Sequence, residues 1–246
     1  MVDKNSSAAS GPAPYGSVFQ TFLVVDNRPV DAPVHIEHML EITGVDIGDF
    51  LQSVTADLHG YHRVRIDCAE PGELSADITD WPMPAILRGE FDQVQSIVAA
   101  LPGEKRDTGH GHTKRSDRSI LAGVEADTLP IIPLLVDSRD FVMETTRQNV
   151  FIIEGDSIVT PPLDGRILPG TTRETVLGIA TETGIKHSEE PVTLTRALQS
   201  DGMFLTNSLS GILWVSHCED AHWPDIPPVA QKLHHLLGQR WHAQTG

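Results

Sequence analysis

The spacing of apolar and polar side chains predicts strands in both halves of the chain. Residues 18–25 (VFQTFLVV) are rich in β-branched and aromatic side chains, which favour a strand. Residues 63–68 alternate between polar and apolar side chains, and a second expected strand covers residues 73–79. The intervening Pro71 and Gly72 are typical of a turn, so we expect a hairpin with one face toward solvent. Further strands are expected at residues 134–137, 141–145, 150–154 and 157–160.

Helical spacing appears in the segments between these strands. Residues 35–58 have mainly helical periodicity, and we expect two pieces because Gly44 and Gly48 interrupt the pattern. A helix near the end of the chain is expected to begin at Pro227 and Pro228, since proline is well tolerated in a first helical turn. Mixed strands and helices predict an α+β protein.

Changes in composition divide the chain into four parts. Residues 1–16 are rich in Ser, Ala, Gly and Pro and are expected to form a disordered tail. A small N-terminal α+β domain is expected at residues 17–105, and a larger C-terminal α+β domain at residues 119–246. Between them, residues 106–118 are polar and basic in an otherwise acidic protein, which indicates an interdomain connection.

The net charge of the 246-residue chain is −16, which argues against nucleic acid or an anionic membrane as a partner. The two cysteines do not form a disulfide framework, and the N-terminus lacks the apolar stretch of a signal peptide. No apolar run approaches the roughly 20 residues that a membrane helix needs. We therefore expect a cytoplasmic protein.

The strongest local signal for a binding site lies at residues 171–174 (TTRE). This stretch fits the S/T-x-x-E capping box, which predicts that Thr171 caps the N-terminus of a helix. Helix N-termini present free N–H groups and a positive dipole end, so they can bind anions. Most capping boxes are structural only, and the pattern alone leaves both interpretations open.

Four sequence elements occur in an order that resembles the class IV aminotransferases, the fold-type IV enzymes that use pyridoxal 5′-phosphate. The elements are HTKRSDR (112–118), METTRQNVF (143–151), ILPGTTR (167–173) and FLTNSLSGI (204–212). Together they are most similar to the aminodeoxychorismate lyase branch of that family. The resemblance implies a two-domain fold-type IV architecture, pyridoxal 5′-phosphate as cofactor, and a homodimer.

The resemblance also implies roles for five residues. Lys114 falls on the catalytic lysine that forms a Schiff base with the cofactor. Glu144 falls on the carboxylate that pairs with the pyridine nitrogen, where a negative charge strengthens the cofactor as an electron sink. Thr171 and Thr172 fall on the helix start that binds the phosphate, and Ser208 falls on a further hydroxyl that contacts it.

Four positions depart from the family pattern, among them Ser210 and Trp214 at the last element, where the family frequently has Arg and Pro. Glu41 stands where the family has an arginine that holds the phosphate, and Leu23 stands where the first strand has another basic residue. A carboxylate 4 Å from a phosphate charge is repelled by about 4 kcal/mol at an effective dielectric constant of 20. The substitution at Glu41 therefore bears directly on cofactor binding.

Three functions follow from these observations. The first is a lyase that converts 4-amino-4-deoxychorismate to 4-aminobenzoate and pyruvate, with Lys114 as general base and acid. The second is a class IV amino-acid transaminase that uses the same lysine. The third is a binding or accessory protein that has lost the cofactor, an alternative motivated by Glu41 and Leu23.

The histidines offer a separate hypothesis of a metal site. His110 and His112 are two residues apart, and His217, Cys218 and His222 also contain metal-ligating side chains. Their spacing matches no standard zinc motif, and twelve histidines produce such pairs by chance. We therefore assign no metal ligand.

Overall fold

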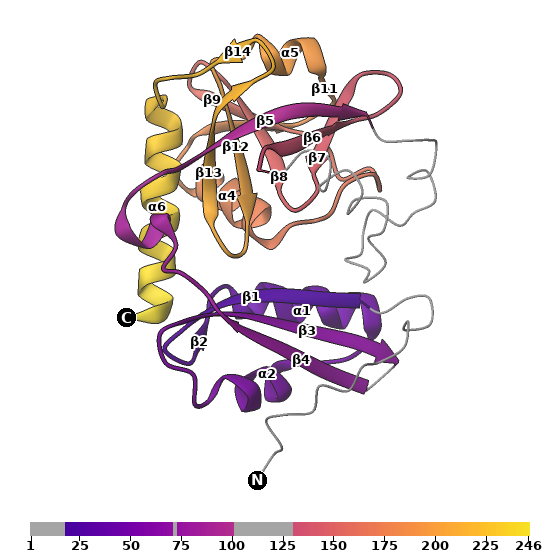
Figure 1. Cartoon of the computed structure of the whole chain (residues 1–246), viewed down its shortest axis with the longest axis vertical. Coiled ribbons are helices and arrows are strands. Elements are labelled where there is room, and N and C mark those ends of the chain that lie inside the picture. Colours follow the sequence, from indigo (N-terminus) through magenta and orange to yellow (C-terminus); the bar gives the residue numbers. More distant parts are fainter. Residues whose placement is uncertain (1–17, 71–72, 101–129) are drawn as a thin grey trace.

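A computed structural model describes residues 18–70, 73–100 and 130–246. These residues form two sheets, each with its own apolar core, and the chain is α+β as its pattern predicts (Figure 1). The expected tail at residues 1–16 and the expected connection at residues 106–118 lie outside the described residues.

The small domain is a four-stranded antiparallel sheet with two helices on one face. Its strand order is β2-β1-β3-β4. The strands are β1 (Val18–Val25), β2 (Arg28–Pro29), β3 (Tyr61–Glu70) and β4 (Glu73–Asp80), and the helices are α1 (Ala32–Thr43) and α2 (Gly48–Thr55). The expected strand at residues 18–25 and the expected hairpin are confirmed. The helical segment is broken where predicted, because Gly44 ends α1 with a φ of 72°.

Successive residues of β1 point to opposite faces and pack into two different apolar cores. Phe22 packs with Val64 and Met39 beneath the helices of the small domain. Leu23 points to the opposite face, is fully buried, and joins the core of the large domain. The position at which the family has a basic side chain is therefore an apolar contact between the two domains.

The large domain is built on a ten-stranded sheet that closes on itself. The path runs β10-β9-β8-β12-β13-β5-β6-β7-β11, and β7 also pairs with β8. The strands are β5 (Asp92–Ala100), β6 (Ile132–Val136), β7 (Phe141–Thr145), β8 (Asn149–Glu154), β9 (Ser157–Thr160), β10 (Lys186–Glu189), β11 (Val192–Thr193), β12 (Gly202–Asn207), β13 (Gly211–Cys218) and β14 (Ala221–His222). Because β7 contacts β8, six of these strands form a closed barrel.

Helices pack around the barrel and connect it to the small domain. They are the 3₁₀ helix η1 (Ala85–Arg88), α4 (Thr171–Glu182), α5 (Leu194–Leu198) and α6 (Pro228–Thr245). The last turns of α6 reach the small domain, where Trp241 Nε1 and Gln244 Nε2 donate to the buried carboxylate of Asp31 at 3.1 and 2.9 Å (Figure 1). The helix therefore spans both domains.

Strand β5 lies in the larger sheet. Its residues fall within the N-terminal domain expected from the sequence at residues 17–105, but its neighbours in space are β13 and β6. Both pairings are parallel and join distant segments, so no local pattern indicates them. Within the described residues, no helix is long and apolar enough to cross a membrane.

Candidate active site

A row of polar side chains crosses three strands of the barrel on one face. Glu144 of β7 is paired with Asn149 of β8, which is paired with Thr206 of β12. Residues paired in this way point to the same side of a sheet, with Cβ atoms about 5 Å apart. All three are at least 95% buried, and the Thr206 hydroxyl has no hydrogen-bond partner.

The polar row holds the loop that leads into α4. Glu144 Oε2 accepts a hydrogen bond from the Leu168 N–H at 3.0 Å, and Asn149 Nδ2 donates to the Leu168 carbonyl at 2.9 Å. A Cβ atom at Gly170 would collide with Asn149 Oδ1, so glycine is required there for the loop to approach β8 so closely. The row thus fixes the loop from two sides.

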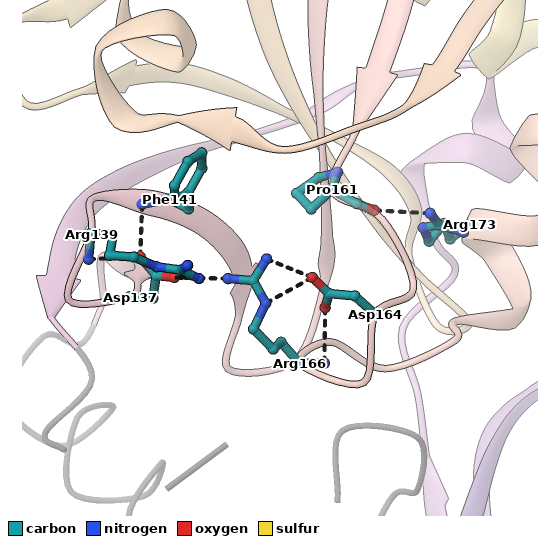
Figure 2. Close-up of polar contacts among 7 residues, drawn as sticks. All are labelled: Asp137, Arg139, Phe141, Pro161, Asp164, Arg166 and Arg173. Atoms are coloured by element: carbon teal, nitrogen blue, oxygen red, sulfur yellow. Dashed lines mark hydrogen bonds and ion pairs between the residues drawn. The ribbon is translucent and has the colours of Figure 1, made fainter. Parts of the chain in front are cut away.

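A second set of contacts anchors the same loop further from the row (Figure 2). Arg166 donates to Asp137 at 2.7 Å and to Asp164 at 2.8 and 2.6 Å. Donation from Arg166 lowers the pKa of Asp164. From the first turn of α4, Arg173 donates back to the Pro161 carbonyl at 3.0 Å. Both ends of the loop are therefore tied down, and the start of α4 has a defined position.

The N-terminus of α4 differs by one residue from the predicted capping box. Gly170, not Thr171, is the N-cap residue, and glycine has no side chain that could accept a hydrogen bond from the first turn. The Thr171 hydroxyl instead contacts His35 Nε2 at 3.2 Å, and the Glu174 carboxylate lies 3.3 Å from His38 Nε2. The first intrahelical hydrogen bond runs from Glu174 N–H to the Gly170 carbonyl. The N–H groups of residues 171–173 precede this bond and have no intrahelical partner.

A buried hydroxyl lies beside these N–H groups. Thr172 is 1% exposed, and its Oγ1 has no hydrogen-bond partner. A buried polar atom without a partner costs free energy, so it indicates a site that a ligand completes. The side chain, the free N–H groups and the helix dipole together form an anion-binding cradle at the start of α4.

The structure brings together three of the five residues singled out from the sequence. Glu144, Thr171 and Thr172 meet around residues 168–170. Ser208 lies at the β12–β13 hairpin, where its Oγ donates to the Thr21 carbonyl of β1 at 2.8 Å, and its phosphate contact remains a prediction. Lys114 lies outside the described residues.

The pattern marks Thr206 only as a hydroxyl in an apolar run, which fits either a loop or a ligand contact, and it indicates no role for Asn149 or His35. Asn149 and Thr206 belong to two of the quoted motifs, so their position in those motifs was the available signal. His35 begins the segment HIEHML (35–40), which resembles the family only loosely and implies no role for this side chain.

The histidines near the end of β13 form a pair. His217 and His222 face each other across β13 and β14 with ring centroids 5.3 Å apart. Across the described ranges, no group of three or more His, Cys, Asp and Glu side chains is placed to hold a metal ion. His110 and His112 lie outside these ranges.

Comparison with known proteins identifies the family that the sequence elements resemble. The family described as amino-transferase class IV matches residues 111–218, which include all four sequence elements. Residues 111–218 therefore belong to the class IV aminotransferase family. Members of this family depend on pyridoxal 5′-phosphate.

Among sequence relatives, a probable branched-chain-amino-acid aminotransferase from Synechocystis is 32% identical over 218 residues. The match covers 87% of this chain and 65% of that relative. A match to a relative from Methanocaldococcus jannaschii covers 46% of that protein. The chain therefore spans less than two thirds of the length of these two curated class IV relatives.

Solved structures of other class IV proteins share the fold. A candidate 4-amino-4-deoxychorismate lyase from Legionella pneumophila superposes with a TM-score of 0.78 over 91% of each chain, at 21% identity. A hypothetical aminotransferase from Mycobacterium tuberculosis in its PLP-bound form gives a TM-score of 0.76 at 19% identity. This match covers 92% of this chain and 89% of that one.

Proposed function

We propose that this class IV protein is a pyridoxal 5′-phosphate-dependent enzyme that acts on a primary amine, and that its reaction is the 4-amino-4-deoxychorismate lyase reaction. The observation that carries the proposal is the contact between Glu144 and the loop before α4, because it joins a buried carboxylate to the loop that leads into the anion cradle. When bound, the cofactor stabilises negative charge at the carbon next to the substrate amine.

The cradle fits the phosphate end of the cofactor. Thr172 Oγ1 is a buried donor without a partner, and the N–H groups of residues 171–173 precede the first intrahelical bond. Glu41 is exposed on α1, so water screens its charge. Its repulsion of a phosphate then falls from about 4 kcal/mol toward the value of about 1 kcal/mol expected at 4 Å in bulk water. Repulsion of that size weakens binding without preventing it.

Glu144 fits the pyridine end of the cofactor. Its carboxylate is 4% exposed, and the Leu168 N–H donates to one of its oxygens. A fixed negative charge in a buried site favours the protonated form of a nearby ring nitrogen. In the proposed reaction the negative charge of Glu144 keeps that proton on the ring nitrogen, and Lys114 moves a proton at the substrate carbon.

The choice of the lyase reaction is supported by the FLTNSLSGI hairpin and by the fold shared with the Legionella protein. The test is to incubate the loaded protein with 4-amino-4-deoxychorismate and to measure pyruvate and 4-aminobenzoate. We expect both products in equal amounts. The Lys114→Ala variant should form neither. Absence of pyruvate at substrate-level enzyme concentration would contradict the lyase proposal.

A transaminase is the second candidate, favoured by the name of the Synechocystis relative. The same loaded protein, offered a panel of amino acids with 2-oxoglutarate or pyruvate, should then convert the oxo acid to its amino acid. Transfer without pyruvate release from 4-amino-4-deoxychorismate would select this activity over the lyase.

Loss of the cofactor is the third possibility, and absorbance separates it from the other two. A cofactor bound covalently to Lys114 should give a visible absorbance band that is absent in Lys114→Ala. A wild-type protein that develops no such band with pyridoxal 5′-phosphate would overturn the proposed function. Glu144→Gln, which keeps an acceptor for the Leu168 N–H, should retain the band while losing most of the activity.

A further inference from the structure

A chain of buried polar side chains connects the small domain to the start of α4. Gln20 lies on β1, His35 on α1 and Thr171 on α4, and they are 4%, 0% and 4% exposed. His35 Nδ1 lies 2.9 Å from Gln20 Oε1, and His35 Nε2 lies 3.2 Å from Thr171 Oγ1. Each contact crosses from one secondary-structure element to another, and the second crosses between domains.

The chemistry of the three groups sets the direction of the hydrogen bonds. The carbonyl oxygen of Gln20 carries no hydrogen, so the proton in that contact belongs to His35 Nδ1. In the neutral imidazole ring Nε2 is then an acceptor, and the Thr171 O–H donates to it. The Thr171 proton is thus directed toward the small domain.

A second contact runs parallel to the first. His38 Nε2 lies 3.3 Å from Glu174 Oε2. The two histidines are three residues apart on α1, and their two partners are three residues apart on α4. Because residues at this spacing share a helix face, α1 contacts the first turn of α4 at two successive positions. Both partners, Thr171 and Glu174, lie in the same first turn of α4 as Thr172, whose hydroxyl is part of the cradle.

We propose that His35, oriented by Gln20, is a positioning residue that acts through the Thr171 hydroxyl to hold the first turn of α4 in the geometry that binds a phosphate group. The inference rests on the proposed function, since it assigns to that site a dependence on the small domain. His35 acts through Thr171. Its loss should therefore weaken the contribution of the phosphate to binding and leave the rest of the cofactor's binding energy unchanged.

The experiment compares two probes on the full chain, pyridoxal 5′-phosphate and pyridoxal, which lacks the phosphate. The ratio of their dissociation constants measures what the phosphate contributes. In His35→Leu, which has similar bulk and no hydrogen bonds, we expect the ratio to fall about fivefold to tenfold, the usual worth of one hydrogen bond. The dissociation constant of pyridoxal itself should change less than twofold.

Two further variants separate positioning from general destabilisation. His35→Gln offers Thr171 an acceptor again, so we expect it to recover most of the ratio. Thr55→Val is the matched control, because Thr55 is 1% exposed in the small domain and its hydroxyl bonds only to carbonyl groups of its own helix. Thr55→Val should lower the melting temperature and leave the ratio at its wild-type value.

A second variant in the small domain tests the inference if His35→Leu does not fold. Gln20→Met removes the contact between Gln20 Oε1 and His35 Nδ1 and changes no residue of α4. It should lower the ratio of the two dissociation constants by a smaller factor in the same direction. A wild-type ratio in whichever of these two variants folds would overturn the inference and leave the proposed function standing. A wild-type protein that binds neither probe would overturn the proposed function and this inference with it.

Discussion

At the scale of single residues, the candidate site is recognised by polar groups that the fold buries without satisfying them. Within the described residues, the hydroxyls of Thr172 and Thr206 are buried and have no hydrogen-bond partner. The motif ILPGTTR singles out Thr172 as a candidate phosphate contact, because the motif can be found in the sequence without knowledge of the fold. His35 was not predictable, since its role depends on which side chain α4 brings next to it.

The unpartnered hydroxyl of Thr172 leads to a prediction in which stability and affinity change differently. Thr172→Val keeps the shape of the side chain and removes the buried polar atom, so the free energy of unfolding should stay the same or rise by up to about 1 kcal/mol. The dissociation constant for pyridoxal 5′-phosphate should rise about fivefold or more. Equilibrium urea unfolding without cofactor and a binding titration measure the two effects.

Thr175→Val is the control for this prediction, one turn further along α4. The Thr175 hydroxyl donates to the Thr171 carbonyl at 3.0 Å, so its removal should reduce stability and leave the affinity unchanged. A Thr172→Val protein that behaves like Thr175→Val would mean that the orphaned hydroxyl does not contact the phosphate.

At the scale of elements, local pattern predicted the strands and helices well and their ends less well. Residues 35–58 form two helices, as the two glycines indicate. The start of α4 was misplaced by one residue because Thr171 and Glu174 form hydrogen bonds or ion pairs with α1 and not with each other's backbone. A capping box predicts hydrogen bonds between two side chains and the backbone of the first helical turn. In this protein the same two side chains contact α1 of the other domain instead.

Helix α6 carries a buried histidine that should make stability depend on pH. His234 is 3% exposed and stacks on Phe91 with ring centroids 3.8 Å apart. Burial lowers the pKa of His234 below its ordinary value of 6.5. The unfolded chain therefore binds a proton more readily than the folded one, and stability should fall as pH decreases below about 6.5. The slope is at most about 1.4 kcal/mol per pH unit.

Urea unfolding of wild type and His234→Gln at a series of pH values between 5.5 and 7.5 measures this dependence. The variant should lose stability at every pH and should show a shallower pH dependence than wild type. His235→Gln, a change at the exposed neighbour on the same helix, should keep the wild-type slope. Equal slopes in wild type and His234→Gln would contradict the assignment.

At the scale of the whole molecule, two cores are joined by a few buried contacts. Leu23 extends the large core into the small sheet, and α6 reaches Asp31 through Trp241 and Gln244. The sequence indicated two domains, but it did not indicate that β5 belongs to the barrel, because β5 pairs in parallel with strands far away along the chain. Such pairings leave no trace in local periodicity.

The contact between Trp241 and Asp31 should couple unfolding of the two domains. Trp241→Phe removes the donor to a buried carboxylate and leaves a void, which should cost about 2–4 kcal/mol. We expect wild type to unfold in one transition, with coincident circular dichroism and fluorescence curves. In Trp241→Phe the two curves should separate as the small domain unfolds first.

Trp223→Phe is the matched control for this loss of coupling. Trp223 is also buried, and its Nε1 donates to the Ser200 carbonyl within the large domain at 2.8 Å. This variant should be destabilised yet keep coincident curves. Separate curves in Trp223→Phe, or coincident curves in Trp241→Phe, would show that the α6 contact does not couple the domains.

The contact between Asp31 and Gln244 can form only at the end of synthesis, because the two residues are 213 positions apart in sequence. A ribosome that adds about 5–20 residues per second needs roughly 10–40 s to make the intervening chain. The helices and sheet of the small domain are complete long before that. During this interval Leu23 and Asp31 face water, so the nascent small domain presents an apolar surface to chaperones and other chains until its last contact arrives.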